Sequence, residues 1–462
     1  MSVRTQKSFT SGPVFMPMLC FVLPIMLTNI LQTLYNIADN VIVGRFSGDP
    51  LALAAVGSTG SLSTLFLNLA VGLSAGASVV ISHAFGARNH QRVSDGVHTA
   101  LTFGLLFGVG LGTVAFVFAE DMLVLIGTKP ELLSSATLYL RIIFAAFPAT
   151  SVYNFAAAAL RAVGDSRTSL YILSLSGLLN VGLNLVFVLG FGMSVDGVAL
   201  ATAISKYVSA AAVVAALALR RGTPYSLHVK KLVISTPMLK RMLRFGVPNA
   251  VQNSMFSISN VLMTGAVNTL ETHALSARTI AMNLTNLVNN VSASYTNAAM
   301  TFAGQNYGAR EYGRIKRTVG VGLMQSVAIT LAVGITCLLF VEPISAFYIA
   351  VGDPAAETII KYAREVCSVT LPFYFICSSM NILSGTLRGV GYSVYPMLIS
   401  VLGICGLRTV WIFTAFRTPA FHSLTGLYIA WPISWVLVIS GLVTVLAVVW
   451  RKMKNATQGA VK

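Results

Sequence analysis

Twelve long apolar segments, separated by short charged or turn-rich stretches, fill nearly the whole chain. They lie near residues 14–44, 51–82, 97–119, 133–158, 169–192, 197–219, 242–268, 274–304, 318–341, 358–386, 394–416 and 424–450. About 20 mostly apolar residues suffice for a helix to cross a bilayer. Only 10% of the 462 residues are charged, against roughly 25% in a soluble protein. The pattern therefore predicts an all-α integral membrane protein with twelve transmembrane helices.

The positions of the basic residues predict the topology. The chain has 31 Lys and Arg against 14 Asp and Glu, a net charge of +17, which favours either a nucleic-acid partner or basic cytoplasmic loops. The termini and the even-numbered gaps between spans hold 22 of the 31 cations. These are Arg4, Lys7, Arg88, Arg92, Arg161, Arg167, Arg220, Arg221, Lys230, Lys231, Lys240, Arg241, Arg244, Arg310, Arg314, Lys316, Arg317, Arg388, Arg451, Lys452, Lys454 and Lys462. The odd-numbered gaps hold about three, Arg45, Lys129 and Arg417. Because positive residues stay cytoplasmic, we expect a multi-pass protein of the cell (plasma) membrane with both termini in the cytoplasm.

The sequence lacks the motifs expected for nucleic-acid binding, for metal or disulfide sites and for nucleotide binding. The basic runs are not interleaved with aromatic residues as a nucleic-acid site would be. The five cysteines and six histidines form no metal-ligand or disulfide spacing, and no phosphate loop of the form GxxxxGK[ST] occurs. We therefore expect no cofactor, no nucleotide and no nucleic acid as a partner, and a chain that works as a monomer.

The chain contains an internal duplication. Residues 84–88 (AFGAR) recur as residues 306–310 (NYGAR), and residues 160–166 (LRAVGDS) recur as 387–393 (LRGVGYS), at offsets of 222 and 227. Pro24 matches Pro248 and Pro148 matches Pro372, both at an offset of 224. Six spans return the chain to its starting side, so the two repeats run parallel and are related by a pseudo-two-fold axis along the membrane normal.

This duplication predicts two six-helix lobes with a cleft between them. We expect an amino-terminal lobe at 1–219, a basic cytoplasmic linker at 220–240 and a carboxy-terminal lobe at 241–462. Substrate sites of such transporters lie near the membrane midplane.

Several motifs, taken in order, resemble those of the multidrug and toxic compound extrusion (MATE) transporters. They are 35–39 (YNIAD) with 43–45 (VGR), 86–88 (GAR), 160–165 (LRAVGD), 305–310 (QNYGAR) and 387–391 (LRGVG). The resemblance covers essentially the whole chain and is closest to the bacterial DinF-type branch. It implies cation-coupled export of lipophilic, often cationic, compounds.

Asp39 is the acidic residue that lies inside a predicted span. An ionisable residue at membrane depth is costly and points to function; the alternative is that the first helix ends early and Asp39 is interfacial. Its helix carries a polar stripe within roughly a 120° arc: Asn29, Gln32, Thr33, Asn36, Asp39 and Asn40. A carboxyl group in such a cavity can exchange a proton with the medium, or hold sodium among neighbouring oxygens.

The resemblance implies a cation site in the amino-terminal lobe, where Asp39, Asn180 and Thr202 match the family's pattern. Asn180 and Asn184 are four residues apart and share a helix face, and Asn154 lies in the preceding span. Some relatives have a second Asp where this chain has Asn184, so sodium affinity is in doubt. If the coupling ion is sodium, its ligands are Asp39, Asn180 and Thr202. The alternative for each Asn is a hydrogen bond between helices, worth about 0.6 kcal/mol in membranes.

The second repeat lacks these polar positions, because Asp39 meets Met263 and Asn180 meets Leu407. It has its own amides instead, which we expect to line the substrate cleft. The predicted cleft residues are Gln32, Asn36, Asn253, Asn260, Met263, Met282, Asn283, Asn286, Asn290 and Arg408. Arg408 lies deep in its span, where it either locks a conformation or contacts an anionic group.

Together these features predict a secondary antiporter that exports amphiphilic small molecules in exchange for H⁺ or Na⁺ by alternating access, with membrane lipid as its other partner. The alternative is a flippase for a lipid-linked saccharide or peptidoglycan precursor. An enzyme is not expected, since Asp39 is the only deep acid and no His or Cys stands at helical spacing to it.

Overall fold

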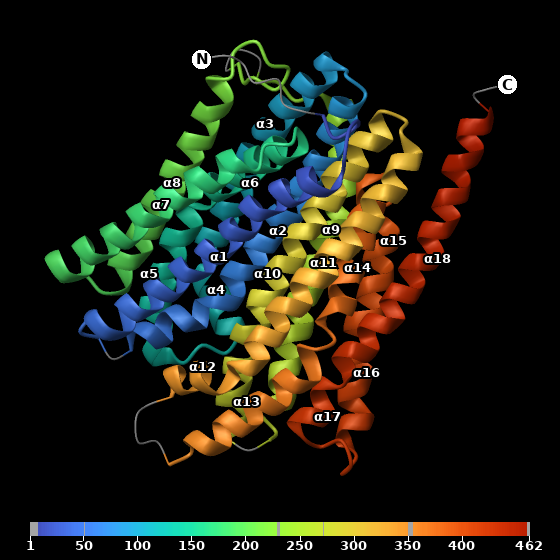
Figure 1. Ribbon diagram of the computed structural model, residues 1–462. Coiled ribbons are helices and arrows are strands. Elements are labelled where there is room, and N and C mark those ends of the chain that lie inside the picture. The colour runs from blue at the N-terminus through green and yellow to red at the C-terminus, as the bar shows by residue number, and fades with distance from the viewer. Residues whose placement is uncertain (1–7, 50, 229–231, 271, 350–353, 460–462) are drawn as a thin grey trace. The chain divides into compact units, whose positions relative to one another are not determined.

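The computed structural model describes residues 8–49, 51–228, 232–270, 272–349 and 354–459, and within these ranges every regular element is a helix (Figure 1). The predicted all-α membrane fold is confirmed. The terminal and linker cations Arg4, Lys7, Lys230, Lys231 and Lys462 lie outside the described residues.

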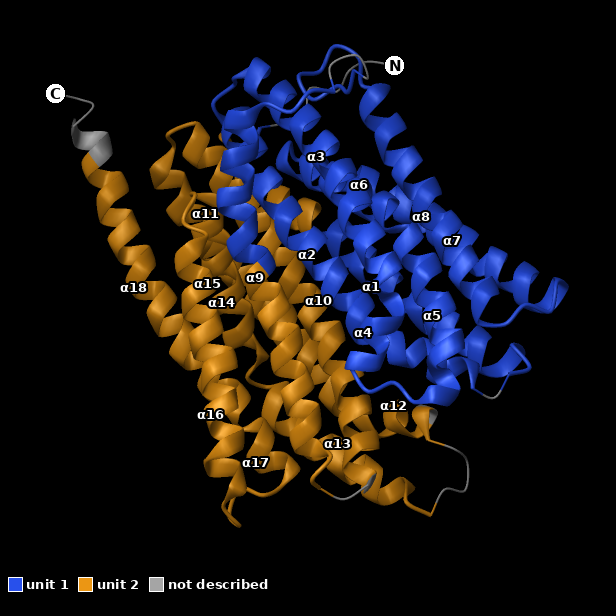
Figure 2. Cartoon of the chain, turned by 180° about the vertical axis from the view of Figure 1, so that it is seen from behind, with its two compact units in different colours: residues 1–8, 23–250 blue, residues 9–22, 251–462 orange. Residues whose placement is uncertain are grey.

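The chain divides into two compact units (Figure 2). Unit 1 is made mainly of Leu23–Ala250, and unit 2 of Phe9–Val22 with Val251–Lys462. The chain leaves one unit for the other next to Pro24 and again next to Pro248, the two prolines that the duplication pairs. The start of the first span thus belongs to unit 2, and unit 1 continues ten residues past the end of the predicted linker.

Among the described residues, unit 1 holds most of the first helix, the helices that follow it and the start of α9 (Thr236–Val267). The elements are α1 (Phe15–Phe46), α2 (Ala52–Gly86), α3 (His90–Val117), α4 (Ala119–Leu125), α5 (Pro130–Ala145), α6 (Phe147–Ala162), α7 (Arg167–Leu185), the π-helical turn η1 (Val186–Gly190) and α8 (Val195–Ala218). The start of α9 packs on α2 at very short range, because a Cβ placed on Gly76 would meet the backbone of Met242 and Gly246. Glycine is therefore required where these two helices touch.

Unit 2 repeats this plan with its own helices. The elements are α9 (Thr236–Val267), α10 (Thr272–Gly308), α11 (Tyr312–Leu339), α12 (Val341–Tyr348), α13 (Ala356–Thr370), α14 (Tyr374–Gly389), α15 (Val394–Ser400), the π-helical segment η3 (Val401–Gly406), α16 (Leu407–Phe413), the short 3₁₀ turn η4 (Ala415–Arg417), α17 (Leu424–Tyr428) and α18 (Ala430–Gly459). Its core is a single apolar cluster that includes Tyr374, Trp431 and Trp435.

Eight of the described helices are long and apolar enough to cross a membrane, and two bent helix pairs bring the number to ten. The other two predicted spans coincide with α9 and α10, which have 32 and 37 residues. At about 1.5 Å per residue both exceed the thickness of the hydrocarbon core. Asparagines make these two helices less apolar than the eight helices that meet the criterion alone.

The two bent pairs correct two predicted continuous helices. The predicted span 133–158 is α5 followed by α6 with a bend of 44°, and 358–386 is α13 followed by α14 with a bend of 48°. Pro148 and Pro372 lie at these breaks, and proline removes a backbone hydrogen bond from a helix and clashes with the preceding turn. The matched prolines therefore mark matched kinks.

The chain turns that end the repeated motifs support the duplication at the level of backbone geometry. Arg88 and Arg310 are the described non-glycine residues with positive φ, at 54° and 61°. Each ends its helix with the same pair of backbone hydrogen bonds, from Arg88 N to Phe85 O and from Arg310 N to Tyr307 O, with a second bond one residue later. This is the left-handed helix cap that glycine usually provides. Gly164 and Gly391, with φ of 91° and 92°, end α6 and α14 in the same way.

Candidate cation site and ligand pockets

Asp39 lies inside α1, seven residues before the helix ends at Phe46. The helix is continuous on both sides of it, so the first helix does not end early at Asp39. Nearby on the same helix, the Tyr35 ring packs where a Cβ on Gly177 of α7 would stand, and its hydroxyl donates to Ser174 O at 3.2 Å. This contact sets the rotation of α1 against α7 and directs Asp39 toward the same helix.

A chain of hydrogen bonds joins the Asp39 carboxylate to α7 and α8. Asn184 Nδ2 donates to Asp39 Oδ1 at 2.5 Å and, at 3.5 Å, to Asn180 Oδ1. Asn180 Nδ2 in turn donates to Thr202 Oγ1 at 3.3 Å. Asn180 and Asn184 are 6% and 0% exposed. The structure thus brings together four of the five residues predicted for the cation site and joins them directly to one another.

A cavity of about 60 Å³ lies at this network, entirely within unit 1. Its lining residues come from α1, α6, α7 and α8: Gln32, Tyr35, Asn36, Asp39, Tyr153, Leu173, Ser176, Gly177, Asn180, Thr202, Ser205, Lys206 and Ser209. A water needs at least about 10–15 Å³ of such space, so the cavity admits a few waters or one small ion and is too small for a drug-sized molecule. Gln32 and Asn36, which we assigned to the substrate cleft, line this cavity with Asp39.

Lys206 is the charged residue of this cavity that sequence reasoning did not assign to it. Residues 202, 205, 206 and 209 all line the cavity, and this spacing is one face of a helix. The Lys206 ammonium and the Asp39 carboxylate interact electrostatically across the space. The phenol of Tyr139, on α5, also lies within the field of Asp39. Lys206 lies four residues after Thr202, so the two side chains share a helix face. This spacing was the sequence signal that could have placed Lys206 in the cavity.

Asn154 is the fifth residue predicted for the cation site. Its Nδ2 donates to Thr150 O, one turn back in α6, at 2.8 Å. It is not among the residues that line the Asp39 cavity. Its assignment as a cation ligand stays a prediction.

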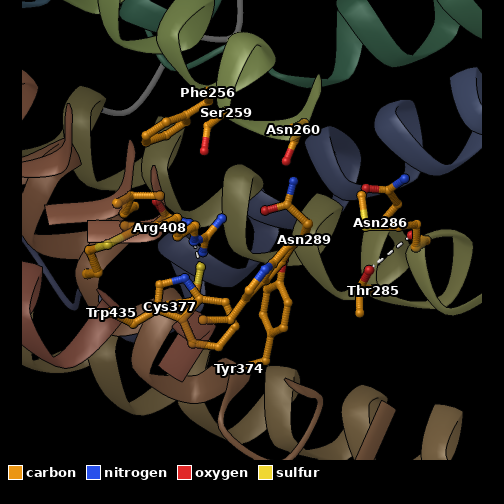
Figure 3. A pocket seen from close by; sticks show the side chains of 15 residues that line it. Phe256, Ser259, Asn260, Thr285, Asn286, Asn289, Tyr374, Cys377, Arg408 and Trp435 are labelled. Atoms are coloured by element: carbon orange, nitrogen blue, oxygen red, sulfur yellow. Dashed lines mark hydrogen bonds between the residues drawn. The ribbon is translucent and has the colours of Figure 1, made fainter. Parts of the chain in front are cut away.

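A second cavity, of about 160 Å³, lies within unit 2 between α9, α10, α14, η3, α16 and α18 (Figure 3). The residues that line it are Phe256, Ser259, Asn260, Met282, Thr285, Asn286, Asn289, Tyr374, Cys377, Met380, Asn381, Ile404, Arg408, Trp431 and Trp435. Four of the predicted cleft residues, Asn260, Met282, Asn286 and Arg408, meet here.

Four other predicted cleft residues do not line this cavity: Asn253, Met263, Asn283 and Asn290. Met263 is 1% exposed and belongs to the unit 2 core. On α10 the cavity face is 282, 285, 286 and 289, whereas Asn283 and Asn290 lie about 100° around the helix from Met282. Asn289, which we did not assign, points from this face toward Asn260 (Figure 3).

The sequence model of the MatE family matches residues 24–186 and 248–414, one match in each repeat. Among curated proteins, the "Probable multidrug resistance protein YoeA" of Bacillus subtilis is 28% identical over 457 residues, with 97% of this chain and 96% of the relative covered. The "Probable multidrug resistance protein NorM" of Thermotoga maritima is 28% identical over 392 residues, covering 84% and 82%.

The fold matches solved transporters over nearly its full length. A structure described as the outward-facing conformation of a multidrug resistance MATE family transporter has a TM-score of 0.88 at 22% identity, covering 98% of this chain and 100% of the other. A transporter of the same superfamily from Pyrococcus furiosus has a TM-score of 0.85 at 21% identity, covering both chains fully. The family match and the relatives that cover most of the chain define a multi-pass membrane transporter. The chain belongs to the MatE family.

Proposed function

We propose that this chain is a secondary active antiporter that exports lipophilic, often cationic, compounds in exchange for an external cation by alternating access. Relatives that align with 97% and 84% of this chain are named probable multidrug resistance proteins, and one that aligns with 88% of it is named a multidrug export protein. The observation that carries the proposal is the Asp39 cavity: a carboxylate inside a spanning helix, joined to three polar side chains, in a space sized for an ion.

The composition of that cavity favours the proton over sodium as the coupling ion. Sodium needs several oxygen ligands and attraction to negative charge. Here Asn184 directs an N–H group at the Asp39 carboxylate, and Lys206 brings a positive charge into the same space. A proton needs only the carboxylate oxygen. The ammonium group compensates the carboxylate after the proton leaves, so both protonation states are tolerated at membrane depth.

The proposed cycle couples this protonation to export. A state open to the cytoplasm takes up the compound, and a state open to the outside allows a proton to reach Asp39. Protonation breaks the attraction between Asp39 and Lys206 and changes the bond from Asn184, and α1 then shifts relative to α7 and α8. Coupling requires that the proton favour one conformation or compete with the compound. The Asp39–Asn184 bond is the contact that differs between the two states.

A flippase for a lipid-linked precursor would need a more basic cavity than an exporter of cationic compounds. A lipid-linked pyrophosphate carries several negative charges and needs several cations around it. Among the described residues that line them, the unit 1 cavity has one cation, Lys206, and the unit 2 cavity has one, Arg408. This charge count favours the exporter.

The test is efflux of a cationic dye from proteoliposomes under separately imposed pH and sodium gradients. Asp39→Asn removes the proton-accepting group with little change of shape, so we expect dye binding to persist and pH-driven efflux to fall to the level of empty liposomes. Asp95→Asn is the matched control, because Asp95 bonds to Gln91 at the exposed start of α3. Normal pH-driven efflux by Asp39→Asn would refute the assignment.

A further inference from the structure

Unit 2 contains a charged group for which its own cavity supplies no counter-ion. Arg408 is 5% exposed and lies on α16, immediately after the π-helical segment η3. None of the described residues that line the cavity is an Asp or a Glu. Buried charges are normally paired, so an arginine here needs a partner.

The protein satisfies this guanidinium only in part. Arg408 Nη2 donates to Ser434 Oγ at 3.4 Å, a long bond, and the guanidinium carbon stands 4.2 Å from the centre of the Trp431 ring. Arg408 Nε has no hydrogen-bond acceptor among the described residues, and neither does the indole Nε1 of Trp431. Trp431 is 8% exposed. Two buried N–H donors of the same cavity are therefore free to bond to something else.

We propose that the unit 2 cavity binds the anionic end of an aromatic compound, with Arg408 holding a carboxylate. A guanidinium matches a carboxylate with parallel N–H···O bonds, and the unpaired Arg408 Nε is one of the donors for such a pair. The Trp431 N–H is a further donor for the same anion.

The walls of the cavity specify the rest of the ligand. Tyr374, Trp435 and Phe256 supply aromatic surface, and Asn260 and Asn289 stand with their amides toward the space that Arg408 also faces (Figure 3). The volume of about 160 Å³ is close to that of the engineered cavity of about 150 Å³ that takes up benzene. One ring with its carboxylate fits, and a larger compound would extend past the amides.

A purely structural role for Arg408 makes a different prediction. In that case the stacking on Trp431 and the Ser434 bond are the whole function, and the cavity shows no preference for a charge. Cation–π contacts without a ligand occur elsewhere in the same unit, since Arg417 stands 5.4 Å from the Phe413 ring outside the cavity. Arg417 is therefore the matched control.

Binding of benzoate and of benzylammonium to the purified full-length protein, measured by isothermal titration calorimetry, tests the proposal. We expect wild-type protein to bind benzoate at least about tenfold more tightly than benzylammonium, since hydrogen bonds to charged groups are worth that much or more. Arg408→Gln should lose roughly tenfold or more in benzoate affinity with unchanged benzylammonium binding. Arg408→Lys should lie between the two, and Arg417→Gln should match wild type.

Two results would overturn the proposal: no preference of the wild-type protein for benzoate, or wild-type benzoate affinity in folded Arg408→Gln. The wild-type comparison stands even if that variant does not fold. Export of such an anionic compound rests on the proposed function, whereas the binding does not. Dye efflux under a pH gradient in the same preparation separates the two, because it can fail while benzoate binds, or persist while benzoate does not.

Discussion

Replacing Lys206 with methionine should strengthen sodium binding in the Asp39 cavity. Methionine keeps most of the length of the side chain and removes the charge. The cavity then holds one carboxylate, the oxygens of Asn180 and Thr202, and no cation. Arginine at the same position keeps the charge and serves as the control.

The size of the effect follows from the Coulomb repulsion between Lys206 and an ion at Asp39, two residues that line the same cavity. For a separation of about 6–8 Å and an effective dielectric constant of about 20, this repulsion is roughly 2–3 kcal/mol. Removing it should raise sodium affinity by roughly 30- to 100-fold.

Two measurements check this prediction. Binding of radioactive sodium to the detergent-solubilised protein should be detectable for Lys206→Met at concentrations where wild type and Lys206→Arg bind none. Dye efflux from proteoliposomes should begin to respond to an imposed sodium gradient in the methionine variant alone. If folded Lys206→Met binds sodium no better than Lys206→Arg, the charge of Lys206 does not set ion selectivity and the reasoning fails.

Two further predictions concern packing and stability in unit 1. Gly177→Ala places a methyl group where the Tyr35 ring stands. The clash should lower the free energy of unfolding by about 1–3 kcal/mol and reduce pH-driven efflux, because it displaces α1. An unchanged melting temperature and efflux rate would contradict the described contact. Asp165→Asn breaks the ion pair with Arg220 and should lower the free energy of unfolding by about 1–3 kcal/mol, whereas Arg221→Gln, at an exposed neighbour, should change it little. Burial lowers the pKa of Arg220, but the attraction of Asp165, the interaction with Tyr225 and the hydrogen bonds to both together outweigh burial and leave that pKa raised. Stability from a raised pKa is present at all lower pH values, so this arginine should add no pH dependence to unfolding between about pH 6 and 9.

Helical periodicity was enough to find the polar faces of α1 and α7. Asn180 and Asn184 are one turn apart and face the same way on any α-helix, and the stripe on α1 needed only a 3.6-residue period. The expectation that these faces meet at Asp39 came from the family resemblance, and hydrogen bonds join Asn184, Asn180 and Thr202 to Asp39. The duplication was equally visible, and the repeated left-handed caps at Arg88 and Arg310 give it a geometric basis.

The features that escaped prediction depend on how each helix is rotated by its neighbours. Lys206 was visible as a charge inside a span, but only packing shows that it shares a cavity with Asp39. On α10 the repeated asparagines at 283 and 290 drew attention to one face, while the cavity uses the face of Asn286 and Asn289. Periodicity gives the stripes of a helix and does not say which stripe faces the cavity.

The two repeats have the same backbone plan but differ in the charges at their cavities: Asp39 and Lys206 line the one in unit 1, and Arg408 alone is charged in the described lining of the one in unit 2. At the offset of 227, Asn180 of α7 corresponds to Leu407, and its neighbour Val181 corresponds to Arg408. A network around a carboxylate in unit 1 thus has its counterpart in an apolar position followed by a guanidinium whose Nε has no acceptor among the described residues of unit 2. Helix packing alone would not require this divergence, since hydrogen bonds between helices serve equally well in both copies. The asymmetry instead argues that the cavities take different ligands, a small cation in unit 1 and an anionic group in unit 2.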